Sequence, residues 1–139
     1  MNPWFSNYRS KQGTVGLGEA ISYYTSLGFT VSLPLNDTQP YDLVIEKDNK
    51  LQKVSVKTTQ QLNRSKKNFV VTLRNSGGAS GKRIIRKFKN TTCDILFVYT
   101  VDDVRYEIPS NLIKVTNYLT LTKDWDKYIV KKNIIKTHP

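Results

Sequence analysis

The feature that most constrains the fold is the stretch 40–59, where two segments with alternating apolar residues flank a short polar run. We predict a β-hairpin with strands over 42–47 and 51–59, because the polar residues 48–50 between them favour turns. Side chains alternate between the two faces of a strand. The chain must therefore build a sheet around this hairpin, with one apolar face and one polar face.

The polar face of the predicted hairpin brings together Asp42, Ser55 and Lys57. The apolar face takes the alternate residues, which are Leu43, Ile45, Val54 and Val56. The turn lies about midway between Asp42 and Lys57, so antiparallel pairing places the carboxylate close to the lysine. A carboxylate held beside a lysine at the start of a buried strand is unusual, although an ordinary solvated hairpin also explains this stretch when it is taken alone.

A helix is predicted upstream of the hairpin, beginning at Thr14 or Val15 and running to about Leu27. Its buried stripe has helical spacing and consists of Leu17, Ala20, Ile21 and Tyr24. Gly28 is expected to end the helix, because glycine readily adopts the left-handed conformation that follows a helix C-terminus. Glu19 lies on another face, where it either has a functional role or interacts with the helix dipole from the first turn.

Further strands are predicted at 29–33, 69–73, 94–101 and 104–108. The segment 69–73 is expected to follow the hairpin as the third strand of a meander. The segment 94–101 is strongly apolar, which indicates burial on both faces of a sheet. Trp125, Tyr128 and Ile129 are expected to pack a terminal helix against the sheet.

A cluster of cations follows a stretch rich in glycine and serine. We expect residues 75–81 to form a flexible loop and residues 82–89 to form a short helix with its cations outward. The cations proposed to contact phosphates are Lys82, Arg83, Arg86 and Lys87. A solvated basic face explains the same pattern without any function.

The charge balance predicts a polyanionic partner. The chain has 22 Lys and Arg residues against 11 Asp and Glu residues, a net charge of +11. Nucleic acid is the simplest such partner, and a general compositional bias is the alternative. The single cysteine, Cys93, excludes an intramolecular disulfide and is expected to be buried in a protein of the reducing cytoplasm. The sequence has neither an apolar run long enough for a membrane span nor the pattern of a signal peptide, so no membrane partner is expected.

Three short motifs carry a family resemblance: Gly18-Glu19 on the predicted helix, Pro40-Tyr41-Asp42 at the start of a strand, and Val54-Ser55-Val56-Lys57-Thr58 on the next strand. Together they resemble the PD-(D/E)XK nuclease superfamily, over roughly residues 14–109. The resemblance is strongest to small proteins associated with group I introns, and archaeal Holliday-junction resolvases are a second relative. It implies a restriction-endonuclease-like α/β fold, with a central mixed sheet flanked by helices, over a single domain of residues 1–139.

The resemblance also implies an activity and a site. The expected function is a Mg²⁺-dependent DNA endonuclease of the intron-homing or phage type, with Mn²⁺ as another usable ion. Asp42 would bind the metal together with the backbone carbonyl of Val56, and Glu19 would hold metal-bound water from the helix. Lys57 would orient or help deprotonate the attacking water and stabilise negative charge. DNA is the expected partner, and a homodimer or higher homo-oligomer would supply the second strand cut.

Ser55 departs from the family pattern, which usually has Glu, Asp or Gln at this position. Three interpretations are open: the site works with one direct carboxylate, Glu46 replaces the missing one, or the protein is a DNA-binding module on a decayed, inactive nuclease fold. An RNA-binding protein without a catalytic site is a further alternative. The single histidine, His138, and the single cysteine argue against a Ser-His-Asp triad and a zinc site.

Overall fold

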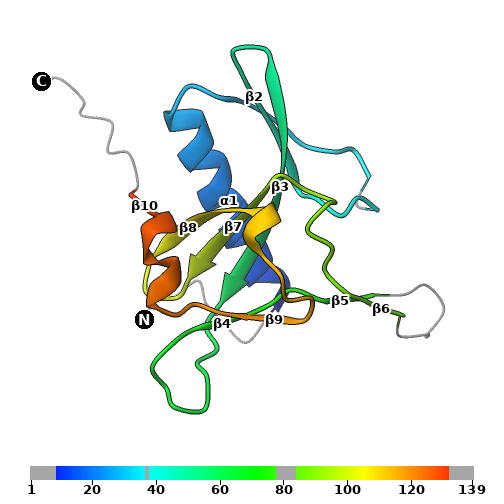
Figure 1. Ribbon diagram of the computed structural model, residues 1–139. Helices are drawn as coiled ribbons and strands as arrows, with labels where there is room; N and C mark the ends of the chain where they lie inside the picture. The colour runs from blue at the N-terminus through cyan, green and yellow to red at the C-terminus, as the bar shows by residue number, and fades with distance from the viewer. Residues whose placement is uncertain (1–8, 37, 78–83, 132–139) are drawn as a thin grey trace, which may run out of the picture.

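The computed structural model describes residues 9–36, 38–77 and 84–131. Its centre is a six-stranded sheet in the order β1-β2-β3-β7-β8-β10 (Figure 1). The strands of this sheet are β1 (Thr30–Ser32), β2 (Leu43–Lys47), β3 (Lys50–Thr59), β7 (Ile95–Thr100), β8 (Arg105–Pro109) and β10 (Ile129–Val130). Neighbouring strands pair antiparallel except β3 and β7, which are parallel. The predicted mixed α/β sheet is therefore confirmed.

The β2–β3 hairpin forms as predicted, and its turn is shorter than expected. Asp48 and Asn49 have positive φ angles of 53° and 62°. Two consecutive positive φ angles are characteristic of the two-residue turns whose twist matches that of the flanking strands. Lys50 already pairs with Lys47, and the register places Leu43 opposite Val54.

One α-helix, α1 (Arg9–Ser26), packs across one face of the sheet (Figure 1). It begins several residues earlier than predicted, and it ends before Gly28, whose φ of 87° confirms the predicted stop. The core on this side combines Ala20, Tyr23, Tyr24, Leu43, Ile45, Val54, Ile95, Phe97 and Tyr99. A Cβ atom at Gly16 would collide with the Thr58 side chain. Glycine at that position therefore allows the helix to approach β3 closely.

The opposite face of the sheet is covered by short strands and 3-10 turns. β4 (Val70–Thr72) pairs with β9 (Tyr118–Thr120), and the 3-10 segments are η2 (Ser110–Leu112) and η3 (Lys123–Tyr128). The core on this side includes Val71, Leu73, Phe88, Cys93, Leu96, Val98, Ile108, Ile113, Leu119 and Leu121. Trp125 and Tyr128 pack against it as predicted, from a 3-10 turn and not from an α-helix, while Ile129 belongs to β10 and is exposed.

The predicted meander is wrong. In the central sheet β3 lies between β2 and β7, and β4 belongs to a different sheet. All six residues of β7 are buried, and the first five alternate between the two cores. A strand that is apolar on both faces is most stable in the interior of a sheet. Parallel strands are also found almost only where both faces of the sheet are covered. The prediction of burial on both faces is therefore confirmed, and β4 is displaced to a small sheet with β9.

At the described residues 75–77 and 84–89, the predicted loop and helix are also wrong. β5 (Asn75–Gly77) and β6 (Ile84–Arg86) form an antiparallel ribbon, which extends away from the central sheet in Figure 1. The β-branched pair Ile84-Ile85 favours a strand over a helix. Of the four predicted phosphate contacts, Arg86 is the last residue of β6 and Lys87 follows it, and both are exposed. Lys82 and Arg83 lie outside the described residues.

Candidate active site

Asp42 lies immediately before β2 and is fixed to β3 by two hydrogen bonds. Its N–H donates to the carbonyl oxygen of Val54 at 2.9 Å, and its carboxylate oxygen Oδ2 accepts the backbone N–H of Val56 at 2.7 Å. The carboxylate thus accepts a hydrogen bond from the backbone of β3 at a position just before β2 begins. Asp42 is exposed, so the carboxylate is both oriented by the sheet and open to solvent.

A hollow of about 290 Å³ opens beside this carboxylate. Its lining consists of Gly13, Thr14, Leu17, Asp42 and Val56. The hollow lies between the first half of α1 and the β2–β3 hairpin, and it brings together Asp42 and Val56, two of the residues predicted to hold a metal. Glu19 and Lys57 do not line it.

Lys57 lies on the face of β3 opposite to Val54 and Val56 and is half-buried. Burial lowers the pKa of the Lys57 ammonium, while the negative charge of Asp42 acts in the opposite direction. The two side chains are therefore electrostatic neighbours, as the hairpin register predicts. Within the described ranges they form no direct ion pair.

The Lys57 ammonium has a partner that the sequence did not indicate. Its Nζ donates a hydrogen bond to Oδ1 of Asn75, the first residue of β5, at 2.7 Å. Asn75 lies in a stretch whose glycines and serines predict a loop, and no motif marks it as a site residue. The inner end of the β5–β6 ribbon is thus connected to the candidate catalytic lysine.

Ser55 shares the face of Lys57, as predicted, but its side chain is enclosed. Its exposure is only 5%, and its backbone contacts the buried Cys93. Burial raises the pKa of the Cys93 thiol, while hydrogen bonds from Ser110 and from the backbone of Ser55 oppose that effect. The prediction that Cys93 is a buried cysteine is confirmed.

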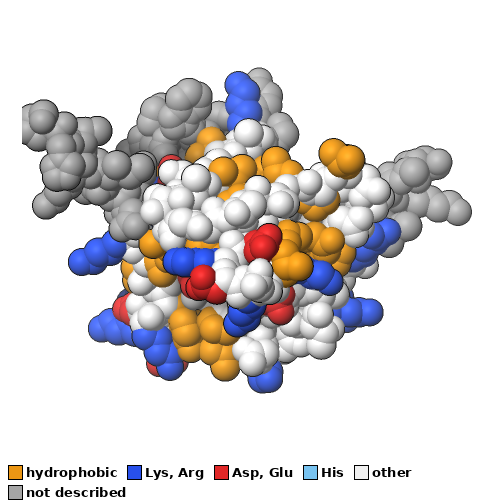
Figure 2. Space-filling model, turned by 90° about the horizontal axis from the view of Figure 1, so that it is seen from above, with side chains coloured by type: hydrophobic (Ala, Val, Ile, Leu, Met, Phe, Trp, Pro, Cys, Tyr) orange, Lys and Arg blue, Asp and Glu red, His pale blue; other side chains and the backbone are white. Residues whose placement is uncertain are grey.

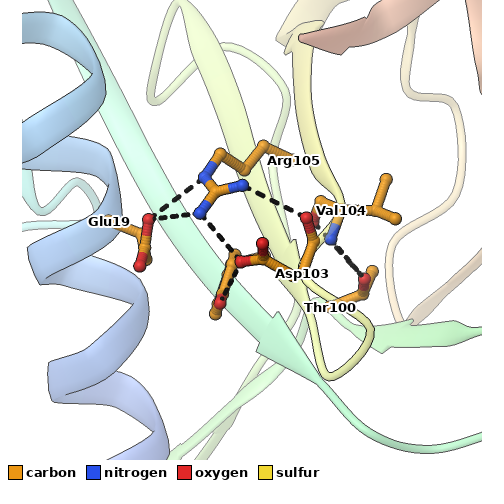
Figure 3. Close-up of polar contacts among 6 residues, drawn as sticks. Glu19, Thr100, Asp103, Val104 and Arg105 are labelled. Carbon is orange, nitrogen blue, oxygen red and sulfur yellow. Dashed lines mark hydrogen bonds and ion pairs between the residues drawn. The ribbon is translucent and has the colours of Figure 1, made fainter. Parts of the chain in front are cut away.

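Glu19 points toward β8 and is held by Arg105 (Figure 3). Oε2 of Glu19 accepts hydrogen bonds from Nε and Nη2 of Arg105, at 3.1 and 2.6 Å. Nη2 also donates to Asp103 Oδ1 at 2.9 Å, and the guanidinium lies 5.0 Å from the centre of the Tyr99 ring. Burial alone would lower the pKa of Arg105, but the contacts with Glu19 and Asp103 raise it. Glu19 occurs in the middle of α1, so the interpretation based on the helix dipole is wrong.

Glu46 is far from the candidate site. It is exposed and pairs with Leu51 next to the turn, at the opposite end of β2 from Asp42. Glu46 lies four residue steps along the extended chain from Asp42, a distance of about 13 Å. The structure therefore gives no support to Glu46 as a replacement carboxylate.

The donor set suits a hard, hydrated cation. In the described part of the chain no group of three or more His, Cys, Asp or Glu side chains is placed to hold a metal ion. The solvent-exposed Asp42 carboxylate and the nearby backbone of Val56 offer oxygen donors only. Mg²⁺ prefers oxygen ligands and commonly keeps several waters while binding one or two carboxylates. The residues present fit such an ion.

A central mixed sheet, a covering helix, an aspartate immediately before one strand and a lysine on the neighbouring strand are typical of the restriction-endonuclease-like class of folds. Consistent with this, the structure is similar to that of a bacterial homing endonuclease, I-Ssp6803I, with a TM-score of 0.71 and 23% sequence identity. The match covers 84% of this chain and 80% of that chain.

The family follows from the sequence itself. The family model described as PD-(D/E)XK endonuclease matches residues 9–135, and the chain belongs to this family. A comparison with curated proteins gave no match. In the described residues, no helix has the length and apolar character needed to span a bilayer.

Proposed function

We propose that the protein is a DNA endonuclease that hydrolyses phosphodiester bonds with the help of Mg²⁺, or of Mn²⁺ in its place. The observation that carries this proposal is the Asp42 carboxylate, which is fixed to the backbone of Val56 and lies near the half-buried Lys57. Membership of the PD-(D/E)XK endonuclease family supports the chemistry. The similar fold of a protein described as a homing endonuclease supports an intron-homing or phage-type role.

Asp42 and the backbone carbonyl of Val56 would hold the metal. A divalent ion at this position supplies Lewis acidity to the scissile phosphate. The hydrogen bond from Val56 keeps the carboxylate in one orientation before any ligand arrives, so little ordering entropy is lost on binding. The exposure of Asp42 leaves room for waters and for a phosphate.

Lys57 would act on the water and on the charge that develops at the phosphate. A lowered pKa makes the ammonium a better proton donor and its neutral form more accessible as a base. The charge of Asp42 keeps enough of the protonated form to stabilise an anionic phosphate. The role predicted for Glu19, holding water at the metal, stays a prediction, and it requires the carboxylate to serve Arg105 at the same time.

DNA binding would use the cations of the ribbon. Arg86 and Lys87 are exposed there, and Arg74, just before β5, stacks on the Tyr118 ring at 5.0 Å. Lys82 and Arg83, which belong to the same proposed surface, lie outside the described residues. Lysine and arginine side chains also protrude around the outline of the view in Figure 2, which suits a net charge of +11. Such charge favours phosphate contacts with any duplex.

The proposed assembly is a homodimer or a higher homo-oligomer in the cytoplasm. One site of this kind cuts one strand, and two-fold symmetry would supply the second cut. A free, buried cysteine suits a reducing compartment.

A second candidate function is a DNA-binding module on a decayed nuclease fold. The observation in its favour is Ser55, a neutral and buried hydroxyl where the family usually has an acid or an amide. The two functions are separated by incubating supercoiled plasmid with the purified protein, with Mg²⁺ or with EDTA. Nicked or linear products that need Mg²⁺ support the endonuclease. DNA binding without any product, in Mg²⁺ and in Mn²⁺, would favour the binding module.

A further inference from the structure

The hydrogen bond between Lys57 and Asn75 connects the candidate catalytic centre to the cationic ribbon. Asn75 begins β5, and in the part of the chain described by the structure it is the one side chain that accepts a hydrogen bond from the Lys57 ammonium. A lysine side chain has four flexible bonds and about 2 kcal/mol of rotamer entropy. A hydrogen-bond acceptor on an ordered strand, such as Asn75, therefore restrains the position of the Lys57 ammonium.

We propose that Asn75 is a positioning residue, which holds the Lys57 ammonium in place for phosphodiester hydrolysis and couples it to the engagement of DNA by the β5–β6 ribbon. The inference rests on the proposed endonuclease function and extends it to a residue of the ribbon.

An amide is suited to this task. The amide oxygen of Asn75 takes one of the three N–H donors of Lys57 and leaves two for a phosphate or a water. A carboxylate in its place would form an ion pair and hold the lysine as an ammonium. An apolar residue would leave the ammonium without an acceptor. Asparagine therefore fixes the position of the lysine without fixing its charge.

The coupling to DNA follows from the register of the ribbon. Asn75 pairs directly with Arg86 of β6. Directly opposed residues of an antiparallel pair project on the same face, with Cβ atoms about 5 Å apart. Arg86 therefore projects from the ribbon on the same face as the side chain that holds Lys57. A phosphate bound by Arg86 would therefore restrain the ribbon at the position of Asn75.

The test compares Asn75→Ala and Asn75→Asp with the wild-type protein, and Asn111→Ala, at an exposed asparagine of η2, is the matched control. The first readout needs no cleavage: the pKa of Lys57 is measured by NMR on protein with ¹³C-labelled lysine, without DNA or metal. Loss of the acceptor should lower this pKa in Asn75→Ala, and the added charge should raise it in Asn75→Asp. The control should leave it unchanged.

The second readout is single-turnover cleavage of duplex DNA in Mg²⁺. A misplaced lysine should slow cleavage by about 10- to 100-fold in Asn75→Ala, with duplex affinity little changed. Melting temperatures of the variants identify any that fail to fold. If Asn75→Ala does not fold, Asn75→Asp still tests the inference, because it is expected to raise the pKa of Lys57.

The outcomes separate this inference from the proposed function. An unchanged Lys57 pKa in both Asn75 variants, or an unchanged cleavage rate in Asn75→Ala, would overturn the positioning role even if the wild-type protein cuts DNA. A shifted pKa in a protein whose wild type cuts nothing would overturn the endonuclease, and with it the hydrolytic role of Asn75, while leaving the hydrogen bond itself established.

Discussion

The backbone N–H of Val56 donates a hydrogen bond of 2.7 Å to the carboxylate of Asp42, and this bond joins the start of β2 to the middle of β3. Among the described residues that line the hollow beside α1, it fixes the one acidic side chain. The same strand carries Lys57 on its other face, one residue further on. The distance between the aspartate and the lysine is thus set by backbone pairing and not by side-chain packing.

The close approach of α1 to β3 predicts opposite effects for two neighbouring glycines. Gly16→Ala should lower the free energy of unfolding by about 1–3 kcal/mol, because its methyl group collides with Thr58. Gly18→Ala meets no atom within 4 Å and should raise it by up to about 1 kcal/mol through helix propensity. Urea denaturation measures both. Thr58→Ser, which removes the obstructing methyl, should restore stability to Gly16→Ala; equal behaviour of the two glycine variants would contradict the packing described.

The contact between Glu19 and Arg105 predicts a loss of stability when the carboxylate is neutralised. Arg105 is only 4% exposed, and Glu19→Gln leaves it with Asp103 as its remaining anionic partner. The free energy of unfolding should fall by about 1–3 kcal/mol. Glu46→Gln, at an exposed position near the β2–β3 turn, is the control and should change it by less than about 0.5 kcal/mol.

The same variant tests the predicted role of Glu19 at the metal. If Glu19 also holds water there, Glu19→Gln should slow cleavage at temperatures where the variant is fully folded. Cleavage at the wild-type rate under those conditions would limit Glu19 to its contact with Arg105.

The half-buried Lys57 predicts that stability depends on pH. Its pKa is lower in the folded protein than the ordinary value of 10.5, so above the folded pKa the unfolded chain binds more protons. Stability then rises with pH, by at most about 1.4 kcal/mol per pH unit, until the pH passes the unfolded value. The free energy of unfolding of the wild-type protein should therefore increase relative to Lys57→Met as the pH approaches 10.5. A difference that stays flat or falls over that range would show that Lys57 is not destabilised by burial.

The ribbon predicts a steep salt dependence of DNA binding. Each of Lys82, Arg83, Arg86 and Lys87 that contacts a phosphate should add about 0.9 to the magnitude of the slope of log affinity against log salt. Replacing all four with alanine should reduce the slope accordingly, as measured by fluorescence anisotropy on a duplex. The control replaces the exposed Lys114, Lys123, Lys127 and Lys131, and should change the slope less. An unchanged slope in the ribbon variant would remove the ribbon from the interface.

Local patterns were sufficient to predict the hairpin and the neighbourhood of Asp42 and Lys57. Alternation and turn chemistry are short-range properties, and an antiparallel hairpin determines which residues face each other. The burial of β7 followed from its composition for the same reason. These features fixed the position of the candidate site before any long-range contact was known.

Long-range pairing could not be predicted in this way. The parallel pairing of β3 with β7, and the contact of Glu19 with Arg105 across 86 residues, depend on how distant segments pack. The ribbon was missed because the glycines of its connecting segment suggested a loop and its cations suggested a helix surface. Asn75 was missed with it, since only the folded ribbon brings its amide to Lys57.

The most direct test of the central claim is single-turnover cleavage by Asp42→Asn in Mg²⁺, measured together with duplex affinity and thermal melting. The asparagine oxygen can still accept the hydrogen bond from Val56, so the strand geometry is kept while the negative charge is lost. We predict that Mg²⁺-dependent cleavage is abolished, that the melting temperature changes little, and that the affinity for DNA is retained. Cleavage by this variant at the rate of the wild-type protein would contradict the assignment of Asp42 as the metal-binding carboxylate and, with it, the proposed active site.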